Sequence, residues 1–359
     1  AGHDIGSGGL ITTLLEMCFS PLTPKGGTTN FTEAGMSLTF ESFKEKDLVK
    51  ILFSENIGIV IQAKSDAEVE SKFQANNIEF FKIGTVQDYG VLEFGDLKFD
   101  IASLRDIWFK TSFLLDQKQS KNGMAQVRFD NYKNQPLQFT FPSHFTGKKP
   151  VIDNTKPRPK AAIIREKGSN SEREMANAMY LAGFDVKDVH MTDLISGRET
   201  LEDIKFIGAV GGFSNSDVLG SAKGWAGAFL YNEKAKTALD NFFKREDTLS
   251  VGICNGCQLF MELEVINPEQ EVHGKMGHNE SQKHESIFTS VTVQENNSVM
   301  LSSLAGATLG VWVSHGEGKF NLPMGEENYN IVSKYAYESY PANPNGSHFD
   351  VAMLCDTTG

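Results

Sequence analysis

The sequence predicts an α/β protein whose second half is a doubly wound parallel sheet, and three observations support this prediction. From about residue 160 onward, apolar strand-like segments alternate with amphipathic helical segments, which is typical of a parallel sheet covered by helices on both faces. One strand runs directly into the turn GICNGCQ at residues 252–258, and a helix-compatible stretch follows. A linker rich in Pro, Lys and turn formers, residues 141–160, separates this half from an N-terminal mixture of strands and helices.

The N-terminal part is predicted to be a mixed α and β unit, because its apolar residues change between helical and strand spacing. We expect helices at residues 10–19, in the first part of 48–63, at 66–77 and at 103–119. We expect strands in the second part of 48–63, at 80–87 and at 90–101.

The C-terminal part begins with the buried-type strand KAAIIRE, residues 160–166. The helix NSEREMANAMYLAGF follows, with Asn170 or Ser171 as its N-cap. The strand KFIGAVGGF, a helix after Trp225 and the strand LSVGIC come next. The last segment, VAMLCDTTG, predicts a strand and then a turn at residues 357–359, and we expect its backbone to be unpaired and prone to fraying.

The bulk composition excludes several classes of protein. A net charge of −12 argues against a nucleic-acid binder, since affinity for phosphate comes mostly from Lys and Arg. No apolar run approaches the roughly 20 residues that a membrane span needs, and no signal peptide is visible. The four cysteines are few and unevenly spread, which favours a reducing, cytoplasmic location over a disulfide framework.

Cys254 lies in the predicted turn between strand and helix, which is the geometry of a nucleophile elbow. Gly252 and Gly256 allow a tight turn and close packing that a Cβ would obstruct. The amino end of the following helix favours the reactive thiolate, and the N–H of Asn255 can point at a developing oxyanion.

Cys254 and Cys257 also form a C-x-x-C pair, which leaves two other interpretations. A structural zinc site would need a second pair of ligands, and the sequence has no second C-x-x-C. A redox dithiol remains open. The elbow glycines and Gln258 favour catalysis by Cys254, with Cys257 as buried packing.

The pattern G-x-C-x-G-x-Q, with Gly252, Cys254, Gly256 and Gln258, resembles the glutaminase elbow of class I glutamine amidotransferases. Further segments resemble those of phosphoribosylformylglycinamidine synthases of the long, single-chain form and occur in the same order. They are HDIGSGGLITTLLEMCFS, REKGSNSEREMANAMYLAGFDVKDVHMTDL, GGFSNSDVLGSAKGWAGAFL, VSHGEGKF and YPANPNGS. The resemblance covers nearly the whole chain, and several ordered motifs are far more specific than the elbow alone.

The resemblance implies a flavodoxin-like glutaminase domain at residues 159–359, incomplete at its C-terminus. It also implies the C-terminal subdomain of an aminoimidazole-ribonucleotide-synthetase-like repeat at 1–100, with a helical segment and linker at 101–158. Family members use ATP, Mg²⁺ and glutamine to convert formylglycinamide ribonucleotide to the amidine. We therefore expect a C-terminal fragment that forms a Cys254 thioester and releases ammonia to a synthetase site in the remaining N-terminal domains. A cysteine hydrolase and a non-catalytic glutaminase-like subunit remain as alternatives.

The resemblance also implies roles for residues outside the elbow. Glutamine would be bound by Gln258 and by the loop Ser314, His315, Gly316 and Glu317. A simpler interpretation is that Gln258 is a buried residue whose amide forms hydrogen bonds with backbone groups. This structural role is compatible with a role in binding glutamine. The turn Gly211–Gly212–Phe213 lies at the same sheet edge as the elbow, so Gly212 or Phe213 is expected to complete the oxyanion site, unless the double glycine serves only a tight turn.

Asn279 and Ser281 belong to the segment HNESQKHE, for which the family suggests packing or support of the glutamine pocket. Lys283 and His284 depart from the family's Arg and Phe, whereas Glu285 is kept.

His315 and Glu317 imitate the spacing of the family's catalytic His–Glu pair, but that pair lies in an H-P-x-E motif that this sequence lacks. A catalytic base is defined by its reach, so the spacing alone does not make His315 the base. We expect the base and its carboxylate partner after Gly359. The other histidines offer no better match.

The turn HDIGSGG opens a helix with Gly8 and Gly9, and such turns can bind an anion through backbone N–H groups. The family form reads H-D-x-S-D-G-G, so Gly6 and Ser7 replace its Ser and acidic residue. A structural turn and an anion site therefore both remain open.

Overall fold

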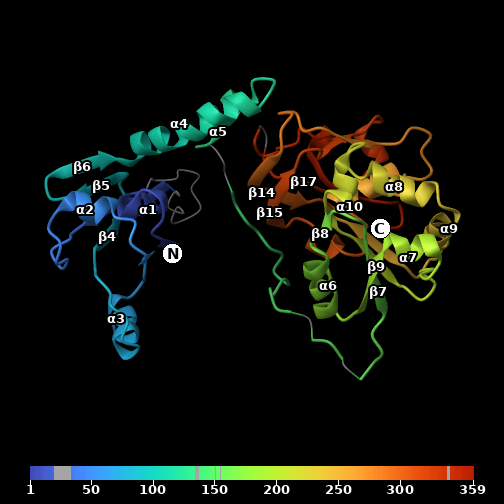
Figure 1. The fold of residues 1–359 in the computed structure, drawn as a ribbon, viewed down its shortest axis with the longest axis horizontal. Helices are drawn as coiled ribbons and strands as arrows, with labels where there is room; N and C mark the ends of the chain where they lie inside the picture. The colour runs from blue at the N-terminus through green and yellow to red at the C-terminus, as the bar shows by residue number, and fades with distance from the viewer. Residues whose placement is uncertain (20–33, 134–136, 150, 154, 338–339) are drawn as a thin grey trace. The chain divides into compact units, whose positions relative to one another are not determined.

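The computed structural model describes residues 1–19, 34–133, 137–149, 151–153, 155–337 and 340–359 (Figure 1). Within these ranges the chain forms two compact units, Ala1–Leu115 and Asp116–Gly359. Residues 150 and 154 of the predicted linker lie outside the described residues, and our three-part division stays a prediction. In the described ranges, no helix is both long enough and apolar enough to cross a bilayer.

The first unit contains the mixture of strands and helices that the sequence predicts. Its elements are β1 Gly2–Asp4, α1 Gly9–Phe19, β2 Gly35–Leu38, α2 Leu48–Phe53, β3 Ile59–Ile61, α3 Asp66–Ala75, β4 Gly84–Gln87, β5 Val91–Phe94, β6 Leu97–Asp100 and α4 Ile101–Gln119, which ends in the second unit. A four-stranded sheet has the order β4-β2-β5-β6, and β2 runs parallel to β5 but antiparallel to β4. Leu14 of α1, Leu92 of β5 and Ile101 of α4 are buried in one core.

The second unit contains the predicted parallel sheet. Its first elements are α5 Met124–Asn131, β7 Lys160–Arg165, β8 Ser169–Asn170, α6 Glu172–Leu181, β9 Asp185–His190, α7 Met191–Ser196, β10 Phe206–Ala209, β11 Gly211–Gly212, η1 Ser214–Asp217, α8 Lys223–Leu230, α9 Glu233–Phe243, β12 Leu249–Gly252 and α10 Asn255–Glu262. The order is β12-β10-β7-β9, and all neighbours are parallel. The doubly wound fold is therefore confirmed.

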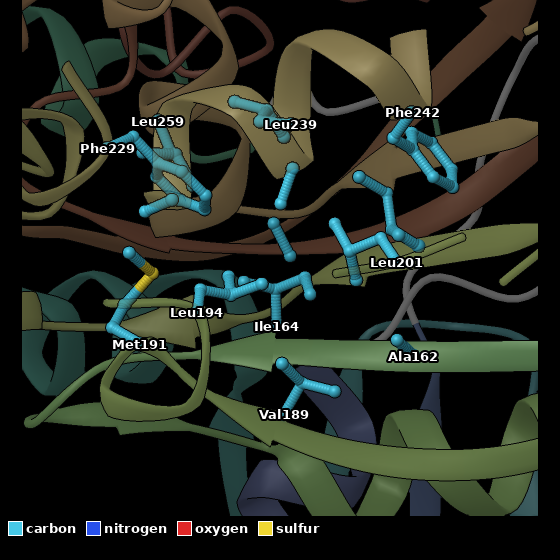
Figure 2. Packing of buried hydrophobic residues seen from close by; sticks show 14 of the residues in the cluster. Ala162, Ile164, Val189, Met191, Leu194, Leu201, Phe229, Leu239, Phe242 and Leu259 are labelled. Carbon is cyan, nitrogen blue, oxygen red and sulfur yellow. The ribbon is translucent and has the colours of Figure 1, made fainter. Parts of the chain in front are cut away.

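Helices cover both faces of this sheet because successive strand residues point to opposite sides. Ala162 and Ile164 of β7 belong to a buried cluster with residues of α7, α8, α9 and α10. Figure 2 shows these strand residues on the side that also carries Leu239 and Phe242. On the opposite face, Ile163 belongs to a cluster with Met175 and Met179 of α6.

A second, antiparallel sheet follows the parallel one, and the sequence did not predict it. The remaining elements are β13 Lys275–Gly277, β14 Glu285–Val293, η2 Ser302–Leu304, β15 Thr308–His315, β16 Lys319–Asn321, η3 Glu326–Asn328, β17 Asn330–Tyr335, η4 His348–Asp350 and β18 Val351–Cys355. The sheet has the order β15-β14-β17-β18. Met261 of α10 is buried in a cluster with Phe320 and Val351, so α10 packs against both sheets.

The predicted final strand and turn are present at the end of the chain. Part of the backbone that we expected to be unpaired has partners: the carbonyl of Gly359 accepts from the N–H of Val299 at 2.8 Å, and that of Thr357 accepts from the Asn297 side chain at 2.9 Å.

Burial in the core between the parallel sheet and its helices is expected to dominate the stability of the second unit. Phe229 of α8 is 1% exposed, whereas Tyr231 at the end of the same helix is 91% exposed. Phe229→Ala should lower the free energy of unfolding by about 3–5 kcal/mol, because it removes apolar contacts and leaves a cavity. Tyr231→Ala should change it by less than about 0.5 kcal/mol. Urea unfolding measures both, and equal losses would contradict this assignment of the core.

Candidate active site

Cys254 stands on a sharp turn between β12 and α10, as predicted. Its backbone angles are φ 56° and ψ −110°, in a region that L-residues rarely adopt. A Cβ at Gly252 would lie 2.4 Å from the carbonyl oxygen of Gly256, and a Cβ at Gly256 would lie 2.0 Å from that of Ala209. The glycines therefore allow the helix to begin directly against β10, which holds the strained turn in place.

Two backbone N–H groups face the sulfur of Cys254. Burial is the largest effect and raises the pKa of the Cys254 thiol, while hydrogen bonds from the N–H groups of Gly212 and Asn255 lower it. The N–H of Asn255 at the start of α10 thus favours the thiolate, as expected, but desolvation outweighs it and the net pKa lies above the ordinary value. The N–H of Phe213 donates to the carbonyl of Gly168 at 2.9 Å, which argues against Phe213 as an oxyanion donor.

A chain of side-chain amides joins the turn of residues 211–214 to the loop of residues 314–318. The N–H of Ser214 donates to Asn255 Oδ1 at 3.2 Å, and Asn255 Nδ2 donates to Gln258 Oε1 at 2.9 Å. Gln258 Nε2 then donates to the carbonyl of Glu317 at 2.8 Å. Asn255 and Gln258 are both buried, so these bonds satisfy their amides and fix both sides of the site to α10.

Asn279 holds the loop 314–318 from the other side. Its N–H donates to the carbonyl of Gly316 at 3.0 Å, and its Nδ2 donates to that of His315 at 2.6 Å. Its Oδ1 accepts from the N–H of Gly318 at 3.0 Å. Asn279 is fully buried, so these contacts make it a support for the loop.

Ser314 brings the loop next to the nucleophile. The thiol of Cys254 lies 3.8 Å from the carbonyl oxygen of Ser314, within hydrogen-bond range for sulfur. The Ser314 hydroxyl is 3.1 Å from Nε2 of His284, whose ring centroid lies 6.4 Å from that of Phe213. His284, which stands where the family has Phe, therefore borders the site.

His315 is partly buried in the loop of residues 314–318. Burial is the main reason that its pKa falls to about 4; His284 lowers it further and Glu285 opposes the fall. A Cβ on Gly318 would overlap the His315 ring, so the ring packs directly against that glycine. That His315 is not the base stays a prediction.

Asp217 was not predicted as a site residue, and it faces Glu317 close to the nucleophile. Burial, and then repulsion by Glu317, raise the pKa of the Asp217 carboxyl, while a hydrogen bond from Ser221 opposes this. Asp217 in turn raises the pKa of Cys254. The N–H of Ser221 donates to Glu317 Oε2 at 3.2 Å. The site therefore holds two carboxylates, and the two residues lie 100 positions apart in the sequence, which hides the pair from local inspection.

Cys257 lies in an apolar environment. It packs against the cluster of Met261 and Phe320, and burial raises the pKa of its thiol to about 12. A dithiol needs a readily ionised sulfur, so this environment favours packing. Among the residues that the structure describes, no three His, Cys, Asp or Glu side chains are grouped as metal ligands would be.

In the glycine turn of the first unit, the backbone N–H groups of Gly8 and Gly9 already have hydrogen-bond partners within the protein. The N–H of Gly8 donates to the carboxylate of Glu55 at 2.9 Å, and the N–H of Gly9 donates to the carbonyl of Gly6 at 3.0 Å. A Cβ at Gly9 would lie 2.7 Å from the backbone of Phe53. These contacts give the turn a structural role, and an anion at Gly8 would have to displace Glu55.

Comparison with known proteins identifies the family. Residues 158–359, more than half of the chain, match the sequence model of the CobB/CobQ-like glutamine amidotransferase domain. The chain therefore belongs to this family. Residues 1–95 match the C-terminal domain of AIR synthase related proteins.

Two curated relatives match the whole chain. A protein of Arabidopsis thaliana named "Probable phosphoribosylformylglycinamidine synthase, chloroplastic/mitochondrial" is 38% identical over 389 residues, and the match covers 100% of this chain and 26% of the relative. The human phosphoribosylformylglycinamidine synthase is 34% identical over 403 residues, covering 100% of this chain and 29% of the relative. The chain thus spans between a quarter and a third of their length.

Solved structures with some similarity include PurLQS from Thermotoga maritima, with 22% identity and a TM-score of 0.45 over 56% of this chain and 84% of that chain. A glutamine amidotransferase from the same organism has 17% identity and a TM-score of 0.35, covering 50% of this chain and 68% of that chain.

The carboxylate of Asp217 should make Cys254 somewhat harder to ionise, in addition to the larger effect of burial. A nearby negative charge disfavours the thiolate, so Asp217→Asn should lower the pKa of Cys254 and leave more thiolate at a given pH. At about pH 8, alkylation of Cys254 by iodoacetamide should become on the order of two- to threefold faster. Mass spectrometry of the Cys254 peptide across a pH series measures this rate. Slower alkylation, or an unchanged pH profile, would remove Asp217 from the surroundings of the sulfur.

Proposed function

We propose that the second unit hydrolyses glutamine at Cys254 and supplies ammonia within a phosphoribosylformylglycinamidine synthase. The observation that carries the proposal is the elbow geometry of Cys254, with the N–H groups of Gly212 and Asn255 directed at its sulfur. Donors in that position can stabilise the oxyanion that forms when a nucleophile attacks an amide carbon. Membership in the glutamine amidotransferase family supports glutamine as the amide.

In the proposed reaction, the Cys254 sulfur attacks the side-chain carboxamide carbon of glutamine and the carbonyl electrons move to oxygen. When the carbonyl re-forms, the C–N bond breaks and leaves a thioester and ammonia, and water then releases glutamate. Burial holds the thiol proton on sulfur, so a base must remove it and return it to the leaving nitrogen. A histidine–glutamate pair after Gly359 stays our prediction for that base.

The two facing carboxylates, Asp217 and Glu317, favour a substrate with a positively charged amino group. Asp217 and Glu317 repel each other, and a cation between them would relieve that repulsion. We assign this position to the α-ammonium of glutamine, with the backbone of residues 314–316 beside its carbon chain. Gln258 contributes by holding the carbonyl of Glu317, so its effect on binding is exerted through the loop.

The activity of the whole enzyme is proposed on the names of the full-coverage relatives. That activity is the ATP- and Mg²⁺-dependent conversion of formylglycinamide ribonucleotide to the amidine, with the N-terminal domains of the complete protein as partners. The Gly8 turn does not fit a nucleotide phosphate, because Glu55 already holds its N–H and would repel the anion, so no step is assigned to this turn. A cytoplasmic location stays a prediction, and one relative's name specifies chloroplasts or mitochondria.

Cys254 is the first target for a test. In the complete protein, Cys254→Ala should abolish synthesis from glutamine but spare synthesis from added ammonia, because only ammonia production needs the thiolate. Cys257→Ser is the matched control and should retain both activities. Loss of both activities in a folded Cys254→Ala protein would refute the assignment, and an equally inactive Cys257→Ser protein would favour the dithiol interpretation.

The assignment of the α-ammonium position predicts a change in selectivity. Glu317→Gln removes one of the two negative charges, so binding of glutamine should weaken by on the order of tenfold. Binding of the analogue without the α-amino group should weaken much less. Competition of both compounds against alkylation of Cys254 gives the two affinities. Equal weakening of both compounds would show that Glu317 shapes the pocket without recognising the ammonium group.

A further inference from the structure

The second unit contains a buried ion-pair network that the proposed chemistry does not use. The guanidinium of Arg128, on α5, donates to the carboxylate of Glu285 and to the hydroxyl of Tyr340, and its Nε lies 3.2 Å from Asp116 Oδ2. The Tyr340 hydroxyl also donates to Glu285 at 2.7 Å. The side chains of Glu285 and Asp116 are 1% and 8% exposed.

The same network holds the loop of residues 278–284. Lys283 forms an ion pair with Asp116, and the Ser281 hydroxyl donates to Glu285 at 2.5 Å. The residues before α5 add two bonds, since the N–H of Lys121 donates to the Ser281 carbonyl at 2.8 Å and the Asn122 side chain donates to that of Glu280 at 2.8 Å. Residues 116–128 and this loop are therefore bound together through both backbone and side chains.

Asn279 connects this loop to the nucleophile. It belongs to the segment that Arg128 and Asp116 hold, and its three hydrogen bonds fix residues 315–318. That segment continues from Ser314, whose carbonyl lies 3.8 Å from the Cys254 sulfur. A continuous set of contacts thus runs from α5 to the proposed glutamine pocket.

Stability alone is a weak explanation for a buried network of this kind. Desolvation of several charges offsets much of their attraction, and apolar side chains of similar size would stabilise such an interface equally well. Charged groups with defined hydrogen-bond geometry instead fix the relative position of the segments that carry them.

We propose that Arg128 is a positioning residue for the glutamine pocket: it fixes the loop 278–284 through Glu285 and Asp116, and through Asn279 it fixes residues 315–318. This inference rests on the proposed glutamine site at Cys254. It predicts that the segment of residues 116–128, which lies outside the matched glutaminase region, sets the affinity for glutamine.

The test uses the 359-residue chain and a reactive diazoketone analogue of glutamine that alkylates Cys254. Arg128→Met alone would leave the charge of Glu285 buried and unpaired, so the decisive variant is Arg128→Met with Glu285→Gln, which removes both charges. The inactivation constant KI should rise by about tenfold, while the rate with iodoacetamide should stay within about twofold. A network that is merely structural would change the thermal midpoint and leave KI unchanged.

Two further variants keep the inference falsifiable if the double variant folds poorly. Lys283→Met removes the partner of Asp116 in the network, a lysine side chain that is 18% exposed, and should raise KI by about threefold. Arg245→Met is the matched control, since Arg245 is another partly buried arginine and donates to the carbonyls of Leu201, Glu202 and Ile204. It should lower the thermal midpoint without changing KI.

The possible outcomes separate the two proposals. An unchanged KI in the folded double variant or in Lys283→Met, with saturable inactivation of the wild type, would overturn the role of Arg128 alone. A rise in KI of equal size in Arg245→Met would also overturn it, because general loosening would then explain the effect. Wild-type protein that reacts with iodoacetamide but shows no saturation with the diazoketone would overturn the glutamine site, and the role of Arg128 with it.

Discussion

The contact of α10 with β10 is the constraint on which the site depends. Gly256 lies so close to the carbonyl of Ala209 that no Cβ could be accommodated, and the strained backbone of Cys254 follows from this approach. Because β10 and β12 are parallel neighbours, their carboxyl ends meet at one sheet edge. The chain leaving β10 therefore brings the N–H of Gly212 to the sulfur at the end of β12.

The same close packing determines the chemistry of the nucleophile. Burial raises the pKa of Cys254 more than its two N–H donors lower it, and Asp217 raises it further. A resting thiol of this kind is protonated and is protected from indiscriminate reaction. In the reaction that we propose, the same donors would act on the oxyanion, whose charge develops only after attack. Under that proposal the site stabilises the transition state more than the thiolate of the free enzyme.

The features that the sequence predicted are those that depend on patterns of neighbouring residues. The strands β7, β10 and β12, the elbow and Gln258 were identified because hydrophobic period and turn glycines lie within a few residues of one another. The sequence analysis did not predict the antiparallel sheet, the pair of Asp217 with Glu317 or the network around Arg128. Each of these joins segments that are distant in the chain, and their pairing depends on tertiary contacts that no local period encodes. The net rise in the pKa of Cys254 was not predicted, because burial around a turn cannot be inferred from the sequence of the turn.

Gln258 illustrates why a structural and a functional interpretation of one residue need not compete. Each polar atom of its side chain has a partner, since it accepts from Asn255 and donates to the carbonyl of Glu317. It therefore has no need of a substrate to satisfy its polar atoms. Yet those two bonds connect the turn of residues 211–214, through Asn255 and Ser214, to the loop that we assign to glutamine. A buried amide that hydrogen-bonds to both sides of a site fixes the position of one side relative to the other. The effect of Gln258 on catalysis would then come from that rigidity and not from contact with glutamine.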